Sequence, residues 1–319
     1  MQTATTETWK YGDPKSHELR LALADHLGCA PGNLVVGEGV DGLLSTLCHL
    51  LIGEGDTIVT TRGTYPTMSY FVAGRGGKVA TVSYNSESKH DLGALIAKAH
   101  ETSAKLIYLV NPDNPSGTWH EPAALEAMVE DLPEGCLLLL DEAYYELCPS
   151  GADPRVAPDD LRVLRLRTFS KAYGLAGARI GYAIGAADTI AAFDRVRNHF
   201  GVSRVSQAGA LAALLDKSYL AEVRQRIETS RQQLELIASE HELLPIPSAT
   251  NFVTMDCRRD ATYARAVLAE LLERDVFCRM PGAPPLDSCI RVSCATAADL
   301  TAFREALPHA LDGAAKRQA

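Results

Sequence analysis

Short apolar runs alternate, over the first two thirds of the chain, with segments in which leucine and alanine recur at helical spacing. The runs are rich in leucine or in β-branched residues, as is typical of buried strands. They read DTIVTTR, KVATVSY, AKLIYLV, CLLLLDEA and VLRLRTFS, and a shorter run, NLVVGEG, breaks into glycines. Near-continuous apolar strands joined by helices are typical of a mostly parallel sheet covered on both faces. The pattern therefore predicts a three-layer αβα unit.

Helices are predicted between several of these strands. Leucines and alanines lie at helical spacing in 18–28, 41–52, 92–100 and 122–132. After about residue 205 the pattern changes to a long charged amphipathic helix, SYLAEVRQRIETSRQQLELIASEH. A strand (NFVTMD), a helix, a strand pair (VFCRM and CIRVSCAT), a last helix and a tail expected to fray (GAAKRQA) follow. We predict a large α/β domain at 30–215 and a smaller α+β domain at 216–319, joined by the N-terminal segment 1–29.

Composition narrows the class of protein. The chain of 319 residues carries 31 Lys and Arg against 40 Asp and Glu, a net charge of −9. This balance argues against a nucleic-acid surface, and the run from Arg162 to Arg167 is the nearest approach to a basic patch. The eight cysteines form no C-x-x-C pair and no zinc spacing, so we expect no metal site and reduced thiols in the cytoplasm. No signal peptide and no membrane span are predicted.

Lys171 is the first candidate for chemistry, because it directly follows a buried strand. A desolvated amine near other cations loses its proton readily and can attack an aldehyde. A lysine extending from a strand end into solvent is the alternative when this residue is taken alone.

Asp141 ends the most apolar strand, CLLLLD, where a carboxylate needs a cationic partner. The pyridinium nitrogen of pyridoxal phosphate is such a partner, and an N-cap for a following helix is the alternative role. Tyr144 lies three residues after Asp141, and the two side chains can lie on the same side if a helical turn begins here.

Two further motifs lie near predicted strand ends. In NPDNPSGT the two prolines preset a turn that can aim the Asn114 amide at a ligand oxygen. In GEGVDG a glycine turn feeds a helix, whose free N–H groups suit a phosphate. Arg179 and Ser170 would complete a phosphate cup. A dinucleotide site is disfavoured, since the next strand ends in Arg62 rather than an acidic residue.

Together these motifs carry a family resemblance. In chain order, NPDNPSG, DEAY and SKAYGLAGARIGY resemble the fold-type I pyridoxal-phosphate aminotransferases, and among them the histidinol-phosphate aminotransferase branch. The resemblance extends from about Tyr11 to the last predicted helix. It implies an aspartate aminotransferase-like fold, a homodimer with shared active sites, pyridoxal 5'-phosphate as cofactor, and an amino donor and a 2-oxo acid acceptor as substrates.

The resemblance also implies residue roles. Lys171 would bind the cofactor aldehyde and carry the proton, Asp141 would pair with the pyridine nitrogen, and Tyr65 would stack on the ring. Cofactor contacts would come from further residues as well: Asn114 and Tyr144 at the ring oxygen, and Gly39, Val40, Asp41, Thr168, Ser170 and Arg179 at the phosphate.

Three more residues are candidates at the edges of the site. Tyr11 matches a tyrosine that reaches the phosphate of the partner subunit. Arg291 matches the arginine that binds the anionic group of the substrate, and an arginine inside an apolar strand needs an anion. Arg279 is a second candidate there, or an ordinary surface arginine.

The sequence also departs from the family pattern. Val40 stands where Ser or Ala is common, and the N-terminal stretch MQTATTETWKYGDP lacks an Asn-Glu-Asn-Pro-like motif that folds over the substrate. A misassigned start, a shortened sequence or a more open site would each explain the second departure. A lyase, decarboxylase or cyclase of the same fold remains an alternative activity, because orientation at the ring decides which bond at Cα breaks.

Overall fold

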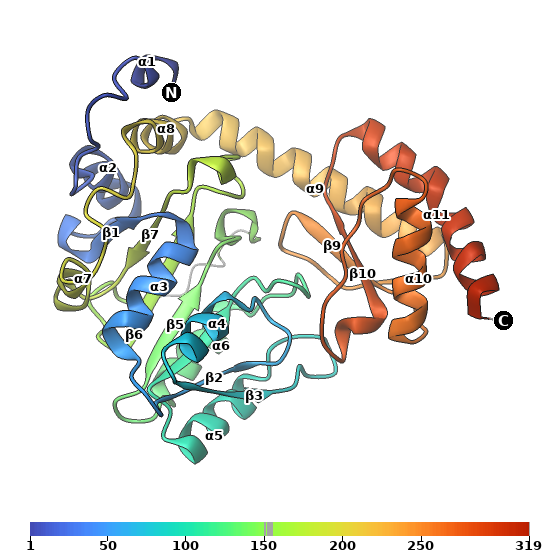
Figure 1. Cartoon of the computed structure of the whole chain (residues 1–319), viewed down its shortest axis with the longest axis horizontal. Helices are drawn as coiled ribbons and strands as arrows, with labels where there is room; N and C mark the ends of the chain where they lie inside the picture. Colours follow the sequence, from blue (N-terminus) through green and yellow to red (C-terminus); the bar gives the residue numbers. More distant parts are fainter. Residues whose placement is uncertain (150, 152–155, 319) are drawn as a thin grey trace.

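A seven-stranded sheet forms the centre of the computed structural model, which describes residues 1–149, 151 and 156–318 (Figure 1). Its strand order is β1-β7-β6-β5-β4-β2-β3. Only β7 runs against the others, because it pairs antiparallel with both β6 and β1. The strands are β1 (Leu34–Gly37), β2 (Thr57–Thr61), β3 (Lys78–Val82), β4 (Leu106–Val110), β5 (Leu137–Asp141), β6 (Val163–Thr168) and β7 (Gly181–Ile184).

Helices cover both faces of this sheet, so the predicted three-layer α/β fold is confirmed. They are α2 (His17–Leu27), α3 (Gly39–Leu51), α4 (Thr67–Gly74), α5 (Leu92–Thr102), α6 (Pro122–Glu130), α7 (Ala187–Phe193) and α8 (Arg204–Leu215), preceded by the short α1 (Gln2–Thr5). The fully buried strand β4 shows why both faces are covered. Tyr108 packs in the cluster under α3 and α4, whereas its neighbours Ile107 and Leu109 pack against α5 and α6.

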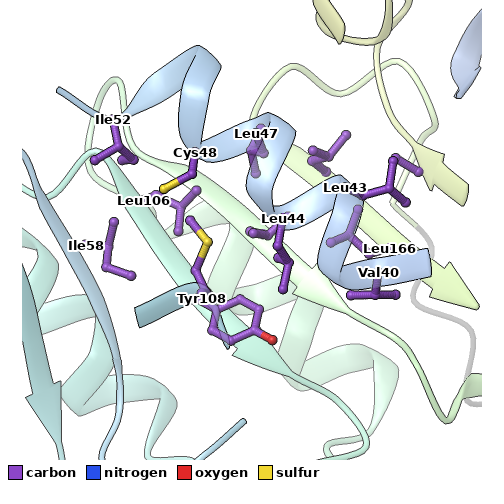
Figure 2. Close-up of a cluster of buried hydrophobic side chains, with 14 of the residues drawn as sticks. Val40, Leu43, Leu44, Leu47, Cys48, Ile52, Ile58, Leu106, Tyr108 and Leu166 are labelled. Atoms are coloured by element: carbon purple, nitrogen blue, oxygen red, sulfur yellow. The ribbon is translucent and has the colours of Figure 1, made fainter. Parts of the chain in front are cut away.

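Helix α3 is held on the sheet by a stripe of apolar residues at helical spacing. Leu43, Leu44, Leu47 and Cys48 are all buried, and Figure 2 shows them pointing toward Leu106 and Leu166 of the strands. This packing fixes the N-terminus of α3 at the carboxyl edge of the sheet.

A second, three-stranded sheet lies in the C-terminal part of the chain, with strand order β10-β9-β8 and antiparallel pairing. Helices α10 and α11 pack on it, and α9 leads into it from the larger sheet (Figure 1). The elements are α9 (Lys217–Glu240), β8 (Leu244–Pro245), β9 (Phe252–Asp256), α10 (Ala261–Leu272), β10 (Cys289–Ser293) and α11 (Ala297–Gln318). The division of the chain at 215/216 stays a prediction.

Two local predictions were wrong. VFCRM is no strand, because only Arg279 bridges to Arg291 and the proline-rich segment 281–285 follows. The tail does not fray at GAAKRQA, because α11 continues to its last described residue. Buried Ala314 packs in the small core, and Arg317 pairs with Glu270 at 2.6 Å.

The basic run 162–167 is not an exposed patch. Arg165 and Arg167 are buried on β6 and bind the buried carboxylate of Glu142 at 2.9 and 2.8 Å. Across the part of the chain that the structure describes, no helix has the length and apolarity needed to cross a bilayer. The same residues hold no cluster of side chains that could bind a metal ion. All eight cysteines are free thiols.

Candidate active site

A cavity of about 160 Å³ opens at the carboxyl ends of three neighbouring parallel strands. Val110, Asp141 and Thr168 are the last residues of β4, β5 and β6, and all three line it. Ligands of α/β proteins bind at this edge of the sheet. The other lining residues are Val40, Asp41, Tyr65, Asn114, Ala143, Tyr144, Ser170, Lys171, Ala176 and Arg179.

Lys171 and Asp141 line this one cavity, although they come from different strand ends. The Lys171 amine lies 5.0 Å from the centre of the Tyr144 ring. Burial lowers the pKa of Lys171, and the positive charge of Arg291 lowers it further. A larger fraction of the amine is therefore neutral than in an exposed lysine, which favours proton transfer or attack on a carbonyl.

The Asp141 carboxylate is 1% exposed and is fixed by two hydrogen bonds. Its Oδ2 accepts from the Tyr108 hydroxyl at 2.7 Å, and its Oδ1 accepts from the Ala143 N–H at 3.1 Å. Burial raises the pKa of Asp141 to about 6 despite these bonds. A buried acid of this kind is stabilised when a cation faces it.

An anion cradle lies at the start of α3. The first N–H groups of a helix have no partner within it and point toward bound anions. Gly39 has a positive φ of 76°, and a Cβ there would lie 2.8 Å from Arg179 Nη2. The absence of a side chain therefore leaves room for Arg179 beside these N–H groups. Thr168 Oγ1 accepts from the Ser170 N–H at 3.1 Å, which orders the opposite wall.

Asp41 belongs to this cradle but is itself acidic. Its carboxylate lies 3.6 Å from Arg179 Nη2 and accepts a hydrogen bond of 2.9 Å from the Tyr65 hydroxyl. Burial raises the pKa of Tyr65 to about 12, so the hydroxyl keeps its proton and donates. Tyr65 is thereby held at the side of the cavity.

Arg291, on β10, does not line the cavity but contacts it through Asn114. Its guanidinium donates to Asn114 Oδ1 and lies 4.7 Å from the Phe252 ring. Burial lowers the pKa of Arg291. Arg279 is exposed, does not line the cavity, and is joined to Arg291 through backbone bonds of 3.1 and 2.6 Å.

Tyr11 lies apart from the other predicted residues. Its side chain is 81% exposed, and its ring packs against Phe200 with the ring centres 5.0 Å apart. It does not line the cavity of its own chain.

The residues present fit pyridoxal phosphate. A cradle that a Cβ would fill suits a phosphate, a buried carboxylate suits a protonated pyridine nitrogen, and a partly neutral amine suits an aldehyde. These groups line the same cavity, and Arg179 lies beside Gly39 at the α3 N-terminus.

Sequence analysis missed Tyr108 and Phe252. Tyr108 lies two residues before Val110 on β4 and so on the same face, and Val110 lies beside Asp141 in the parallel register. Strict alternation along the strand could therefore have placed Tyr108 on the side of the sheet that carries the acid. No sequence signal places Phe252, because its contact with Tyr144 joins the smaller sheet to the segment that follows β5.

Comparisons with known proteins agree with the fold and the motifs. Residues 2–307 match the family "Aminotransferase class I and II". Histidinol-phosphate aminotransferase from Bacillus velezensis is 34% identical over 90% of this chain and 79% of its own length.

Two solved structures extend the comparison. Histidinol-phosphate aminotransferase from Sinorhizobium meliloti, in complex with pyridoxal-5'-phosphate, matches with a TM-score of 0.95 and 48% identity, over 98% of this chain and 85% of that one. An aspartate aminotransferase mutant from Thermus thermophilus has a TM-score of 0.82 at 24% identity, over 99% and 90% of the chains, which confirms the predicted fold. The chain therefore belongs to the class I and II aminotransferases and is a pyridoxal-phosphate-dependent enzyme.

Proposed function

We propose that this enzyme is a histidinol-phosphate aminotransferase, which moves the amino group of that phosphorylated donor to a 2-oxo acid. Lys171 and Asp141 line one cavity, and Arg291 bonds Asn114 of the same lining; this arrangement carries the proposal. It offers a base, an acid partner for a heteroaromatic nitrogen, and a cation for an anionic substrate group. The relatives from Bacillus velezensis and Sinorhizobium meliloti, named for this reaction, support the choice of donor.

The lining of the cavity supports the proposed residue roles. The N–H groups at Gly39, Val40 and Asp41 bind the cofactor phosphate together with Ser170, Thr168 and the Arg179 guanidinium. Asn114, Tyr144 and Tyr65 line the same cavity. Asn114 and Tyr144 would bind the ring oxygen, and Tyr65 would stack on the ring.

Two residues, Lys171 and Asp141, would control the positions of the protons during the reaction. When bound, the cofactor supplies an electron sink for the pair released at the substrate Cα. The neutral Lys171 amine would remove the Cα proton as a general base. The ammonium group formed in this way would then donate the proton as a general acid. The Asp141 carboxylate, held by Tyr108, keeps a proton on the nitrogen that faces it.

The donor assignment is tested by an assay of the purified holoenzyme. We expect glutamate to form when histidinol phosphate and 2-oxoglutarate are supplied together, and not when either is left out. Glutamate formed only from other amino acids would overturn the donor while keeping the aminotransferase. Release of CO₂ from an amino acid without glutamate would favour the decarboxylase alternative.

Arg291 is predicted to bind the anionic group of a substrate. R291Q is expected to raise the donor KM about tenfold to a hundredfold, because a hydrogen bond to a charged group is lost. R279Q serves as the matched variant, since Arg279 is exposed and its backbone, not its side chain, bonds Arg291. Steady-state kinetics in which R279Q has the larger effect would reverse the assignment.

We infer that the enzyme is a homodimer in which Tyr11 serves the partner's site. Trp9, Tyr11 and Phe200 leave large aromatic surfaces exposed near the N-terminus, which a second copy would cover. Light scattering is expected to give twice the chain mass of 34.3 kDa. Y11F is expected to weaken cofactor binding about tenfold in the intact dimer, through one lost bond to a phosphate. A monomeric wild-type protein, or unchanged cofactor affinity in Y11F, would contradict this.

The free thiols and the absence of spanning helices in the described residues support a proposed cytoplasmic location.

A further inference from the structure

Asp113 is a fully buried carboxylate, 0% exposed, directly before Asn114 in the loop that follows β4. The proposed mechanism does not use it. Its Oδ1 accepts from Thr64 Oγ1 at 2.6 Å and lies 3.2 Å from His90 Nε2. Its Oδ2 accepts from the Tyr84 hydroxyl at 2.9 Å and from the Ser116 N–H at 3.0 Å. A buried charge with this many donors is held in one position.

His90 is the central donor of this network. Its Nε2 lies 3.0 Å from the Val110 carbonyl oxygen as well as 3.2 Å from Asp113 Oδ1. Both atoms are acceptors, so Nε2 carries a hydrogen and donates. Its Nδ1 lies 2.7 Å from Thr61 Oγ1 at the end of β2. The imidazole therefore joins β2 and β4 to the loop.

The network stays charged at Asp113 and protonated at Tyr84. Burial opposes ionisation of Asp113, but the charge and hydrogen bond of His90 outweigh it and keep its pKa below the ordinary value. Burial and the neighbouring Asp113 raise the pKa of Tyr84, so its hydroxyl donates.

The other side of the same loop is tied to the smaller sheet. The Pro115 carbonyl accepts from Thr254 Oγ1 on β9 at 2.5 Å. Thr254 is the register partner of Arg291 on β10, and Arg291 donates to Asn114. Gly117 approaches Ser248 so closely that a Cβ on it would lie 2.7 Å from Ser248 Oγ. Asn114 thus lies between two fixed neighbours: Asp113, held by His90 beside the larger sheet, and Pro115, bonded to Thr254 of the smaller sheet.

We propose that Asp113 is a positioning residue, whose carboxylate, held by His90, fixes the loop that places Asn114 and, through it, the Arg291 guanidinium. The proposal rests on the roles given above to Asn114 and Arg291. It adds that a residue outside the cavity sets their separation from the cofactor site.

The carboxylate cannot be replaced by its isosteric amide. Each oxygen of Asp113 faces one donor that cannot turn away: His90 Nε2 at Oδ1 and the Ser116 N–H at Oδ2. An asparagine must direct its NH₂ group at one of them. Moving the His90 hydrogen to Nδ1 gives no relief, because Nε2 would then face the Val110 carbonyl. In D113N two donors therefore face each other, and we expect the loop to move rather than only to lose a hydrogen bond.

The test compares D113N holoenzyme with wild type in donor KM and in the visible absorbance maximum of the bound cofactor. We expect a donor KM at least about tenfold higher and a shifted maximum, because Asn114 moves relative to the ring oxygen. E270Q is the matched control. Glu270 is also a buried carboxylate held by two arginines, but it lies on α10 far from the cavity. A lower Tm with unchanged KM and absorbance is expected for E270Q.

A double-mutant cycle gives the decisive result. If Asp113 acts through Arg291, the effect of R291Q on KM shrinks in the D113N background. Fully multiplicative effects, or a D113N that behaves as E270Q does, would overturn the proposal. Because wild type is assayed alongside, a failure of the proposed donor appears as no wild-type turnover and is not confused with this outcome.

Y84F keeps the test decisive if D113N does not fold. It removes one donor from Asp113 and leaves the charge and His90 in place. Its donor KM is expected to rise about two- to tenfold. An unchanged KM and an unchanged absorbance maximum in a folded Y84F would likewise refute the positioning role.

Discussion

K171A is expected to lose both turnover and the visible absorbance band of the bound cofactor. The loss of general acid–base catalysis alone lowers the rate by about a hundredfold to ten-thousandfold. The loss of the amine that faces the aldehyde removes the covalent route as well. The side chain lines the cavity, and the pKa of its amine is lowered by burial.

The measurement pairs an absorbance spectrum with a glutamate assay on the same sample. Lys98 lies on α5, does not line the cavity and pairs with Glu101, so K98A controls for the loss of one lysine. A K171A protein that keeps wild-type activity would remove the lysine from the mechanism. Cofactor retention by K171A without the band is compatible with the prediction, because the phosphate cradle is unchanged.

D141N is expected to have opposite effects on activity and on stability. The amide cannot balance a positive charge on the ring nitrogen, so kcat should fall about a hundredfold to a thousandfold. The fold tolerates the amide, since its oxygen can accept from Ala143 N–H and its NH₂ can donate to Tyr108, whose hydroxyl turns. Asp113 has no such arrangement, because both of its oxygens face fixed donors.

The stability effect of D141N depends on pH. Burial raises the pKa of Asp141 from 3.8 to about 6, so between these values the folded protein holds a proton that the unfolded chain releases. The free energy of unfolding of the cofactor-free protein therefore falls as pH rises, by up to roughly 3 kcal/mol above pH 6. D141N escapes this cost. It should be the more stable protein at pH 8, and the advantage should vanish near pH 4.

Urea unfolding of both cofactor-free proteins at pH 4, 6 and 8 measures this difference. Stability differences that do not change with pH would show that Asp141 is ionised without penalty in the empty site.

The strand ends of the site could be predicted from the sequence, because the motifs follow apolar runs directly. Parallel strands bring their carboxyl ends to one edge, so Asp141 and the loop carrying Lys171 had to meet there. The family resemblance added Val40, Asp41, Tyr65 and Thr168, whose roles stay predictions, whereas the lining residues Val110, Ala143 and Ala176 were not predicted. Strand β7 was not predicted, since its glycine-rich sequence does not read as a strand.

The network around Asp113 could not be predicted. His90 lies in the polar segment SESKHD, which indicates an exposed loop, yet it is 2% exposed. Its burial depends on partners contributed by Thr61, Val110 and Asp113, which only the folded sheet brings together. Buried polar groups of this kind carry no periodic signal, because their hydrogen bonds depend on three-dimensional position alone.

The antiparallel pair β6–β7 separates two tasks of the enzyme. Lys171 and Arg179 both lie on the one connection between these strands, so the proposed base and one of the proposed phosphate ligands belong to a single local unit. Arg291 arrives from the smaller sheet instead. Under the proposed roles, the β6–β7 connection holds only part of the cofactor, and the α3 N-terminus and Asp141 of β5 complete that site. Substrate binding by Arg291 would depend on how the smaller sheet packs against the larger one. Substitutions on the smaller sheet can therefore change which substrate is bound while the cofactor contacts on the larger sheet stay the same.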